Sequence, residues 1–152
     1  MERDAGLKME YPEVNKLIEA VKRLNLSVSR GSDIIDVNDL YYRWIKFFIN
    51  GETVHLPFMD EYDDAVQLNP VVMLNMALVE CEMIEETSDF AEWCKDSGAL
   101  PDHPNASKLY NYLKKSVKEF RHHVGNELEP IPYFDIELNT GKARALREAV
   151  IE

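Results

Sequence analysis

The chain has 152 residues, of which 45% are hydrophobic and 30% are charged, and its net charge is −11. These values exclude a disordered chain and are typical of a soluble globular protein. No apolar run approaches the ~20 residues of a membrane-spanning helix, and the N-terminus lacks the basic and apolar regions of a signal peptide. We therefore expect a cytoplasmic protein, with a flexible N-terminus at residues 1–10 and a single globular domain at residues 11–152.

The first predicted element is a helix that opens at Tyr11-Pro12-Glu13. Apolar residues repeat there at helical spacing, and Asn25 can end the helix. Residues 26–32 favour a turn or a short strand around Gly31.

Residues 36–58 carry two conflicting signals. Aromatic and β-branched residues are enriched there and Asn50-Gly51 is a strong hairpin signal, which favours strands. The apolar period from Val37 to Phe48 instead favours a helix, which Asn50-Gly51 could equally end. We favour the helix over 36–50, followed by a short strand at 52–58 that ends at Pro57.

The stretch from Asn69 to Lys95 predicts one long central helix, after a possible helical turn at 60–68. Asn69 is a good N-cap and Pro70 suits the first turn. From Val71 to Val79 only Asn75 is polar, so this part should be buried. Further on, two faces are expected. The apolar face carries Met76, Val79, Met83, Thr87, Phe90 and Cys94, and the acidic face carries Glu82, Glu85, Glu86, Asp89, Glu92 and Asp96.

Residues 106–124 give the clearest helical pattern, closed by Gly125 and bearing lysines on its outer side. We expect its apolar face to pack antiparallel against the central helix. Residues 133–138 alternate like a strand, and a last helix follows Asn139-Thr140-Gly141. The predicted fold class is mainly α, with four to five helices and at most a small antiparallel β element. The alternative is α+β with a β-hairpin at 41–58.

The two cysteines are predicted to be unpaired. Cys81 and Cys94 lie thirteen residues apart on the predicted central helix, which would separate them by about 20 Å. Both should be buried and unreactive, because apolar surroundings and nearby carboxylates disfavour a thiolate.

Motifs for catalysis or cofactor binding are weak. Two Glu-x-x-His pairs, Glu52/His55 and Glu119/His122, have the spacing of di-iron carboxylate sites, but the first lies between Gly51 and Pro57, too short a segment for a core helix. The acidic run from Asp60 to Asp64 lacks the spacing of a calcium loop. We expect no catalytic residues, no metal site and no cofactor.

The excess negative charge lies in one central third of the chain. From Phe47 to Cys94 there are eleven carboxylates and no lysine or arginine, while the remainder holds as many acidic as basic residues. This distribution argues against nucleic acid or an anionic membrane as a direct ligand of the region. One interpretation is that the 106–124 helix supplies the counter-charge. The other is that the carboxylates face outward and bind a basic protein. The candidate partner-binding residues of this chain are then Asp60, Glu61, Asp63, Asp64, Glu82, Glu85, Glu86, Asp89 and Glu92.

The functional hypothesis is a small acidic non-enzymatic protein that binds a basic macromolecular partner. Inhibitors, immunity proteins and nucleic-acid mimics likewise use an acidic surface to cover a basic site on their target. The alternatives are a helical metal-binding protein or enzyme that uses histidine and glutamate residues, and a plain structural or scaffold domain. The sequence does not indicate an oligomeric state.

Overall fold

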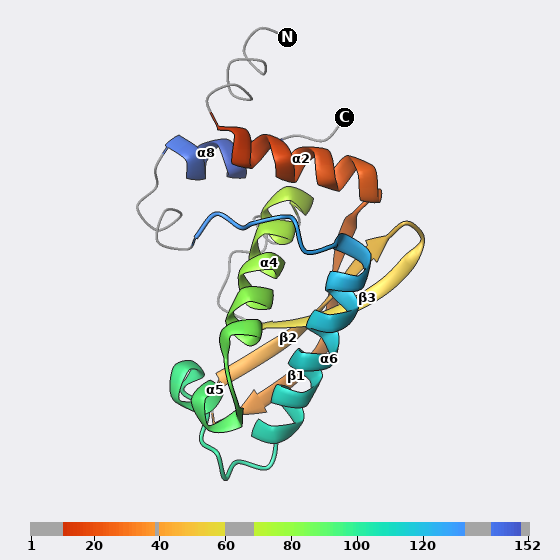
Figure 1. Ribbon diagram of the computed structural model, residues 1–152. Helices are drawn as coiled ribbons and strands as arrows, with labels where there is room; N and C mark the ends of the chain where they lie inside the picture. The colour runs from red at the N-terminus through yellow and green to blue at the C-terminus, as the bar shows by residue number, and fades with distance from the viewer. Residues whose placement is uncertain (1–10, 39, 60–68, 133–140, 150–152) are drawn as a thin grey trace, which may run out of the picture.

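The computed structural model describes residues 11–38, 40–59, 69–132 and 141–149. In this part the chain forms five helices and a three-stranded sheet. In chain order the elements are α2 (Pro12–Leu24), β1 (Ser27–Val37), β2 (Leu40–Ile49), β3 (Glu52–Met59), α4 (Pro70–Glu86), α5 (Phe90–Ser97), α6 (Ala106–Val124) and α8 (Gly141–Arg147). Figure 1 shows α4 and α6 in front of the sheet, α2 and α8 at one end and α5 at the other. The architecture is α+β. The favoured prediction of a mainly α fold is therefore wrong, and the alternative of an α+β fold is right.

The sheet corrects the helix that the apolar period favoured at 36–50. These residues form the end of β1 and all of β2, which pairs antiparallel with β1 on one side and β3 on the other. Buried residues alternate along β2 at Ile45, Phe47 and Ile49. The aromatic and β-branched composition was therefore the better guide, because such side chains pack well on a pleated surface.

The β-hairpin at 41–58, which was the alternative to the favoured helix, is confirmed. Ile49 pairs with Glu52, so Asn50 and Gly51 form a two-residue turn, with φ values of 50° and 84°. Positive φ at both positions is what a type I′ hairpin requires. The expected strand end at Pro57 is wrong, since β3 continues to Met59. A proline is tolerated there because β3 lies at an edge of the described sheet.

Gly31 sits at an irregularity of β1. The register with β2 shifts between Arg30 and Ile34, and a side chain at Gly31 would place its Cβ 2.7 Å from the carbonyl oxygen of Trp44. Only glycine fits so close an approach of two backbones. The predicted turn or short strand at 26–32 is thus the bulged first half of a longer strand.

The predicted central helix is two helices. Asn69 caps α4 as expected, accepting hydrogen bonds from the backbone N–H groups of Val71 and Val72 at 2.9 and 3.3 Å. However, α4 ends at Glu86, and a new N-cap, Asp89, accepts a bond from the Glu92 N–H at 2.9 Å to start α5. Thr87, Ser88 and Asp89 bond readily to nearby backbone, which favours such a break over a continuing helix.

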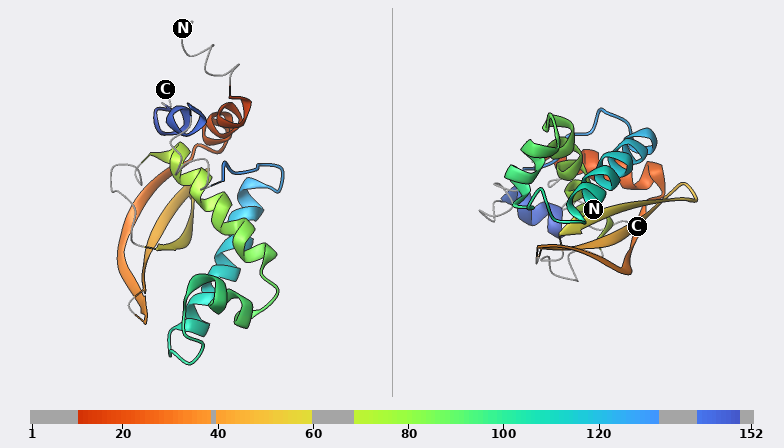
Figure 2. Two further views of the ribbon diagram at one scale, coloured as in Figure 1. Left: turned by 90° about the vertical axis from the view of Figure 1, so that its left-hand side faces the viewer. Right: turned by 90° about the horizontal axis from the view of Figure 1, so that it is seen from below.

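Helix α6 has the predicted bounds and ends at Gly125, whose φ is 93°. Its apolar face is buried, but α4 is only one of its partners, because the helix also packs on β3 and α5. Phe120 is fully buried, with its ring centroid 5.2 Å from that of Phe47 in an edge-to-face arrangement. The 106–124 helix therefore lies over the sheet as well as beside α4 (Figure 2).

Helices α2 and α8 confirm the first and last predicted helices and pack together at one end of the fold. Lys142 forms an ion pair with Glu13 at 2.6 Å, and this contact lowers the pKa of the Glu13 carboxyl. Ala143, Ala145 and Leu146 are buried against the remaining core. The first and last described helices, α2 and α8, are therefore held in contact.

A few predictions lie outside the described residues: the flexible N-terminus at 1–10, the helical turn at 60–68 and the strand at 133–138. Among the helices that the structure describes, none combines the length and apolar character needed to cross a membrane.

Candidate partner-binding surface

A two-point ion pair joins α4 to α6. The Arg121 guanidinium donates from Nε to Glu85 Oε2 at 3.1 Å and from Nη2 to Oε1 at 3.0 Å. Burial is the largest single influence on the pKa of Arg121 and would lower it, but the hydrogen bond to Glu85 and the nearby negative charges together outweigh burial, so the pKa is raised. The interpretation in which the 106–124 helix supplies counter-charge is therefore right for Glu85. This pair divides the surface between the two helices into an acidic and a basic side.

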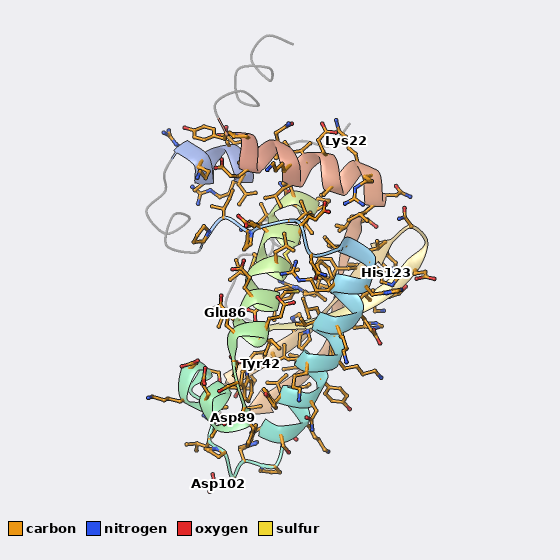
Figure 3. All side chains as sticks on the ribbon, viewed as in Figure 1. Lys22, Tyr42, Glu86, Asp89, Asp102 and His123 are labelled. Atoms are coloured by element: carbon orange, nitrogen blue, oxygen red, sulfur yellow. The ribbon has the colours of Figure 1, made fainter. Side chains whose placement is uncertain are left out.

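On the acidic side, two carboxylates of α4 have no ion-pair partner among the described residues. Glu82 and Glu86 lie one turn apart on α4, and neither forms an ion pair with any residue in the part of the chain described here. Partial burial raises the pKa of Glu82, and the charges of Glu86 and Glu129 raise it further, against the opposing effect of Arg121. Three carboxylates thus lie near one another. In Figure 3 Glu86 is on the side of α4 away from α6.

Met83 lies among these carboxylates with 46% of its surface exposed. It was expected on the buried apolar face of the helix, and that expectation is wrong. The helix ends at Glu86, so Phe90 and Cys94, expected on the same face, belong to a separate helix, α5. We call Glu82, Met83, Glu86 and Glu129 the acidic surface.

The remaining predicted residues have local roles or fall outside the described chain. Asp89 caps α5, and the Ser88 hydroxyl donates to the Glu92 carboxylate. Both carboxylates are exposed. Asp60, Glu61, Asp63 and Asp64 lie outside the described residues. Of the nine predicted residues, the structure therefore brings together Glu82, Glu85 and Glu86, and separates Asp89 and Glu92 by a helix break.

The basic side is a groove of about 750 Å³ between α4 and α6. Ile84 and Val117 line its base, and Glu85 and Arg121 line the edge next to the acidic surface. The lining also includes four cationic or polar side chains of α6 and one polar residue just beyond its end, namely Lys114, Lys115, Lys118, His122 and Asn126. The lysines were predicted to be on the outer side of the helix, but the groove depends on the α4–α6 contact, which the sequence alone does not locate.

The other candidate chemistry is dispersed. Cys81 and Cys94 are free and buried; burial raises the pKa of both thiols, that of Cys81 to about 12. Glu52 pairs with His123 at 3.2 Å and not with His55, whose ring meets Trp44. Within the described ranges, no three histidine, cysteine or carboxylate side chains gather closely enough to hold a metal ion. Glu52 of the first Glu-x-x-His pair instead contacts His123, the neighbour of His122 in the second pair.

Glu80 is a titratable group that sequence reasoning missed. It follows the buried part of α4, and burial raises the pKa of its carboxyl to about 7. No ion pair or hydrogen bond of this side chain exists in the described structure. Its position directly after an apolar run was the signal that could have revealed it.

Comparison of the chain with family models, with curated proteins and with solved structures found no match. The function has to be inferred from the surface itself.

Proposed function

We propose that this is a non-enzymatic binding protein that docks a basic protein on its acidic surface. An inhibitor, an immunity protein or a mimic of nucleic acid would use such a surface to cover a basic site on its target.

The observation that supports this proposal is the exposure of Met83 among uncompensated carboxylates. A large, flexible apolar side chain can act as an anchor in an interface, because it adapts to the shape of the partner. The carboxylates around it attract a basic protein and set its orientation. Together they resemble an interface with an apolar centre and a charged rim.

The charge arrangement supports the same conclusion. Glu82 and Glu86 stand at i,i+4, a like-charge spacing that destabilises a helix by roughly 0.2–0.5 kcal/mol. Glu85, next to Glu86, has its own counter-ion in Arg121, whereas Glu82 and Glu86 have no ion-pair partner among the residues that the structure describes. A basic partner would relieve this repulsion by placing positive charge next to Glu82 and Glu86.

The test compares capture of partners from cells that naturally express the chain. The variants are Glu82→Gln/Glu86→Gln, which removes two charges, and Met83→Ser, which removes the apolar anchor. The matched control is Glu19→Gln/Glu148→Gln, which removes two exposed charges on α2 and just after α8. A specific basic protein should be captured by the wild type and the control, and lost or reduced with both surface variants.

Kinetics with the captured protein then examine the mechanism. The Glu82→Gln/Glu86→Gln variant should associate more slowly and show a flatter salt dependence, because steering by charge is reduced. Met83→Ser should act mainly on dissociation. If both surface variants bind as the control does, the acidic surface is not the docking site.

A further inference from the structure

We propose that the groove between α4 and α6 binds an acidic amphipathic helix of a protein partner. This site is distinct from the acidic surface and takes a ligand of opposite charge. This inference does not depend on the proposed function, because it rests on the cationic side chains of α6 and not on the acidic surface.

The cationic side chains of the groove are available for a ligand. Lys115 and Lys118 are exposed, and neither forms an ion pair with any carboxylate in the described parts of the protein. Lys114 lies 5.1 Å from the centre of the Tyr110 ring, a contact that leaves its other donors open. A chain of net charge −11 thus keeps three lysines together on one helix, and within the described residues none of the three forms an ion pair.

The spacing of these residues fits a helix as the ligand. Lys115, Lys118 and His122 stand at i, i+3 and i+7 on α6, so they form a row about 10 Å long over two turns. A helix that carries glutamates at i, i+4 and i+7 repeats its charges over the same length. Two helices already form the walls of the groove, which is the setting in which an amphipathic helix is bound.

The base of the groove favours an apolar side on that helix. Ile84 and Val117 are only 8% and 4% exposed, so they form a packed apolar floor. The aliphatic stems of the lysines extend the apolar surface above that floor. An incoming helix could place leucines mainly against the lysine stems, above this floor, and its carboxylates against the lysine ammonium groups.

Nucleic acid fits less well. A polyanion gains affinity by contacting many cations along its length, and the basic row of the groove spans only two turns. The adjoining carboxylates of Glu82 and Glu86 would repel a phosphate backbone that ran past the Glu85–Arg121 pair. A helical segment can end within the groove and avoid them.

The test measures fluorescence anisotropy with a labelled synthetic peptide of about five helical turns, with glutamates on one face and leucines on the next. Its comparators are the same peptide with glutamine in place of leucine, and a single-stranded oligonucleotide of equal charge. The protein variants are Lys115→Gln/Lys118→Gln in the groove and Lys16→Gln/Lys22→Gln on α2, where both lysines are also exposed. Circular dichroism verifies that each variant is folded.

The Glu–Leu peptide should bind the wild type. In the groove variant, the Kd of this peptide should rise about three- to tenfold, as expected for the loss of two exposed charge contacts. The α2 variant should bind as the wild type does. Glu82→Gln/Glu86→Gln should leave peptide binding unchanged or strengthen it, which separates this site from the acidic surface.

Three outcomes would overturn the proposal. One is the absence of peptide binding, and another is an equal loss in the groove and α2 variants. The third is binding of the oligonucleotide or the glutamine peptide at least as tightly as the Glu–Leu peptide, which would indicate a site for polyanions in general.

Discussion

The Arg121 guanidinium and the Glu85 carboxylate meet through two parallel hydrogen bonds of 3.1 and 3.0 Å, across the contact between α6 and α4. The Arg121 side chain is only 12% exposed and that of Glu85 is 41% exposed. The same guanidinium donates from Nη1 to the Gly125 carbonyl at 3.3 Å, and so also fixes the end of α6. Adjacent carboxylates of one helix therefore have different roles, Glu85 in the fold and Glu86 on the open surface.

This difference predicts opposite effects of two neighbouring substitutions. Glu85→Gln should lower the free energy of unfolding by about 0.5–1 kcal/mol, a modest value because Glu85 is well exposed, and added salt should reduce the loss. Glu86→Gln should be neutral or slightly stabilising, since it relieves repulsion with Glu82. Urea unfolding at low and high salt measures both. Equal losses in the two variants would contradict the assignment.

Asn75 should be essential to the core despite being polar. Its amide is fully buried, donates to the Ile131 carbonyl at 3.0 Å and accepts from the Ile131 N–H at 2.6 Å. Asn75→Ala would leave two buried backbone groups unpaired and should cost about 2–4 kcal/mol. Asn126→Ala, an exposed control, should change stability by less than about 0.5 kcal/mol. Similar values for the two would mean that water replaces the Asn75 bonds.

Phe120 tests the packing of α6 on the sheet. Phe120→Ala removes a fully buried ring that contacts Phe47 and should cost about 3–5 kcal/mol. Leu100→Ala, at a position that is 54% exposed, provides the surface comparison and should have little effect. A loss below about 1 kcal/mol for Phe120→Ala would show that this face is not core.

Glu80 should make stability depend on pH. Its folded pKa of about 7 lies above the ordinary value of 4.5, so the folded chain binds this proton more tightly than the unfolded chain. The resulting stabilisation is fully present below about pH 4.5 and is lost as the pH rises through about 7. Glu80→Gln should therefore stabilise the protein by about 1–3 kcal/mol at pH 8, and by much less near pH 4.5. A gain that is independent of pH would exclude burial of the charge as the cause.

The thiols should react slowly in the native state. Both cysteines are buried and burial raises the pKa of each, so little thiolate is present at pH 8. Labelling with a thiol-specific disulfide reagent should be slow for the folded protein and fast after denaturation. Single Cys81→Ala and Cys94→Ala variants assign the rates. Rapid native labelling of Cys94 would make it a candidate nucleophile again.

Local signals in the sequence were sufficient for the helices with clear ends. The Asn69 cap, the positive-φ stop at Asn25 and the glycine after Val124 are each set by residues within one turn. The signal at Asn50 and Gly51 was ambiguous by contrast, because the same two residues could end a helix or form the hairpin turn that the structure shows. The helix predicted over 36–50 failed because a helical period can arise by chance within an aromatic strand, and pairing with β1 and β3 decided the outcome.

The candidate surface was predictable only in part. The carboxylates of α4 were found, and Arg121 was within the helix suspected of supplying counter-charge. The approach of Glu129 to Glu82 depends on the path of the chain after α6, which Asn75 fixes through a contact 56 residues away. Met83 lies within α4, yet 46% of its surface is exposed, which the apolar face expected of one long helix did not predict. Such features arise from tertiary contacts and carry no local signature.

The packing of α8 against α2 has a consequence for the order of events during synthesis. The amide of Asn69 donates to the carbonyls of Arg147 and Ala149 at 3.3 and 3.4 Å, so the start of α4 also depends on the last described residues. Until that segment leaves the ribosome, the buried face of α2 lacks one of its covers. This end of the domain can therefore complete its fold only after residues 141–149 have been synthesised, later than the sheet and α6.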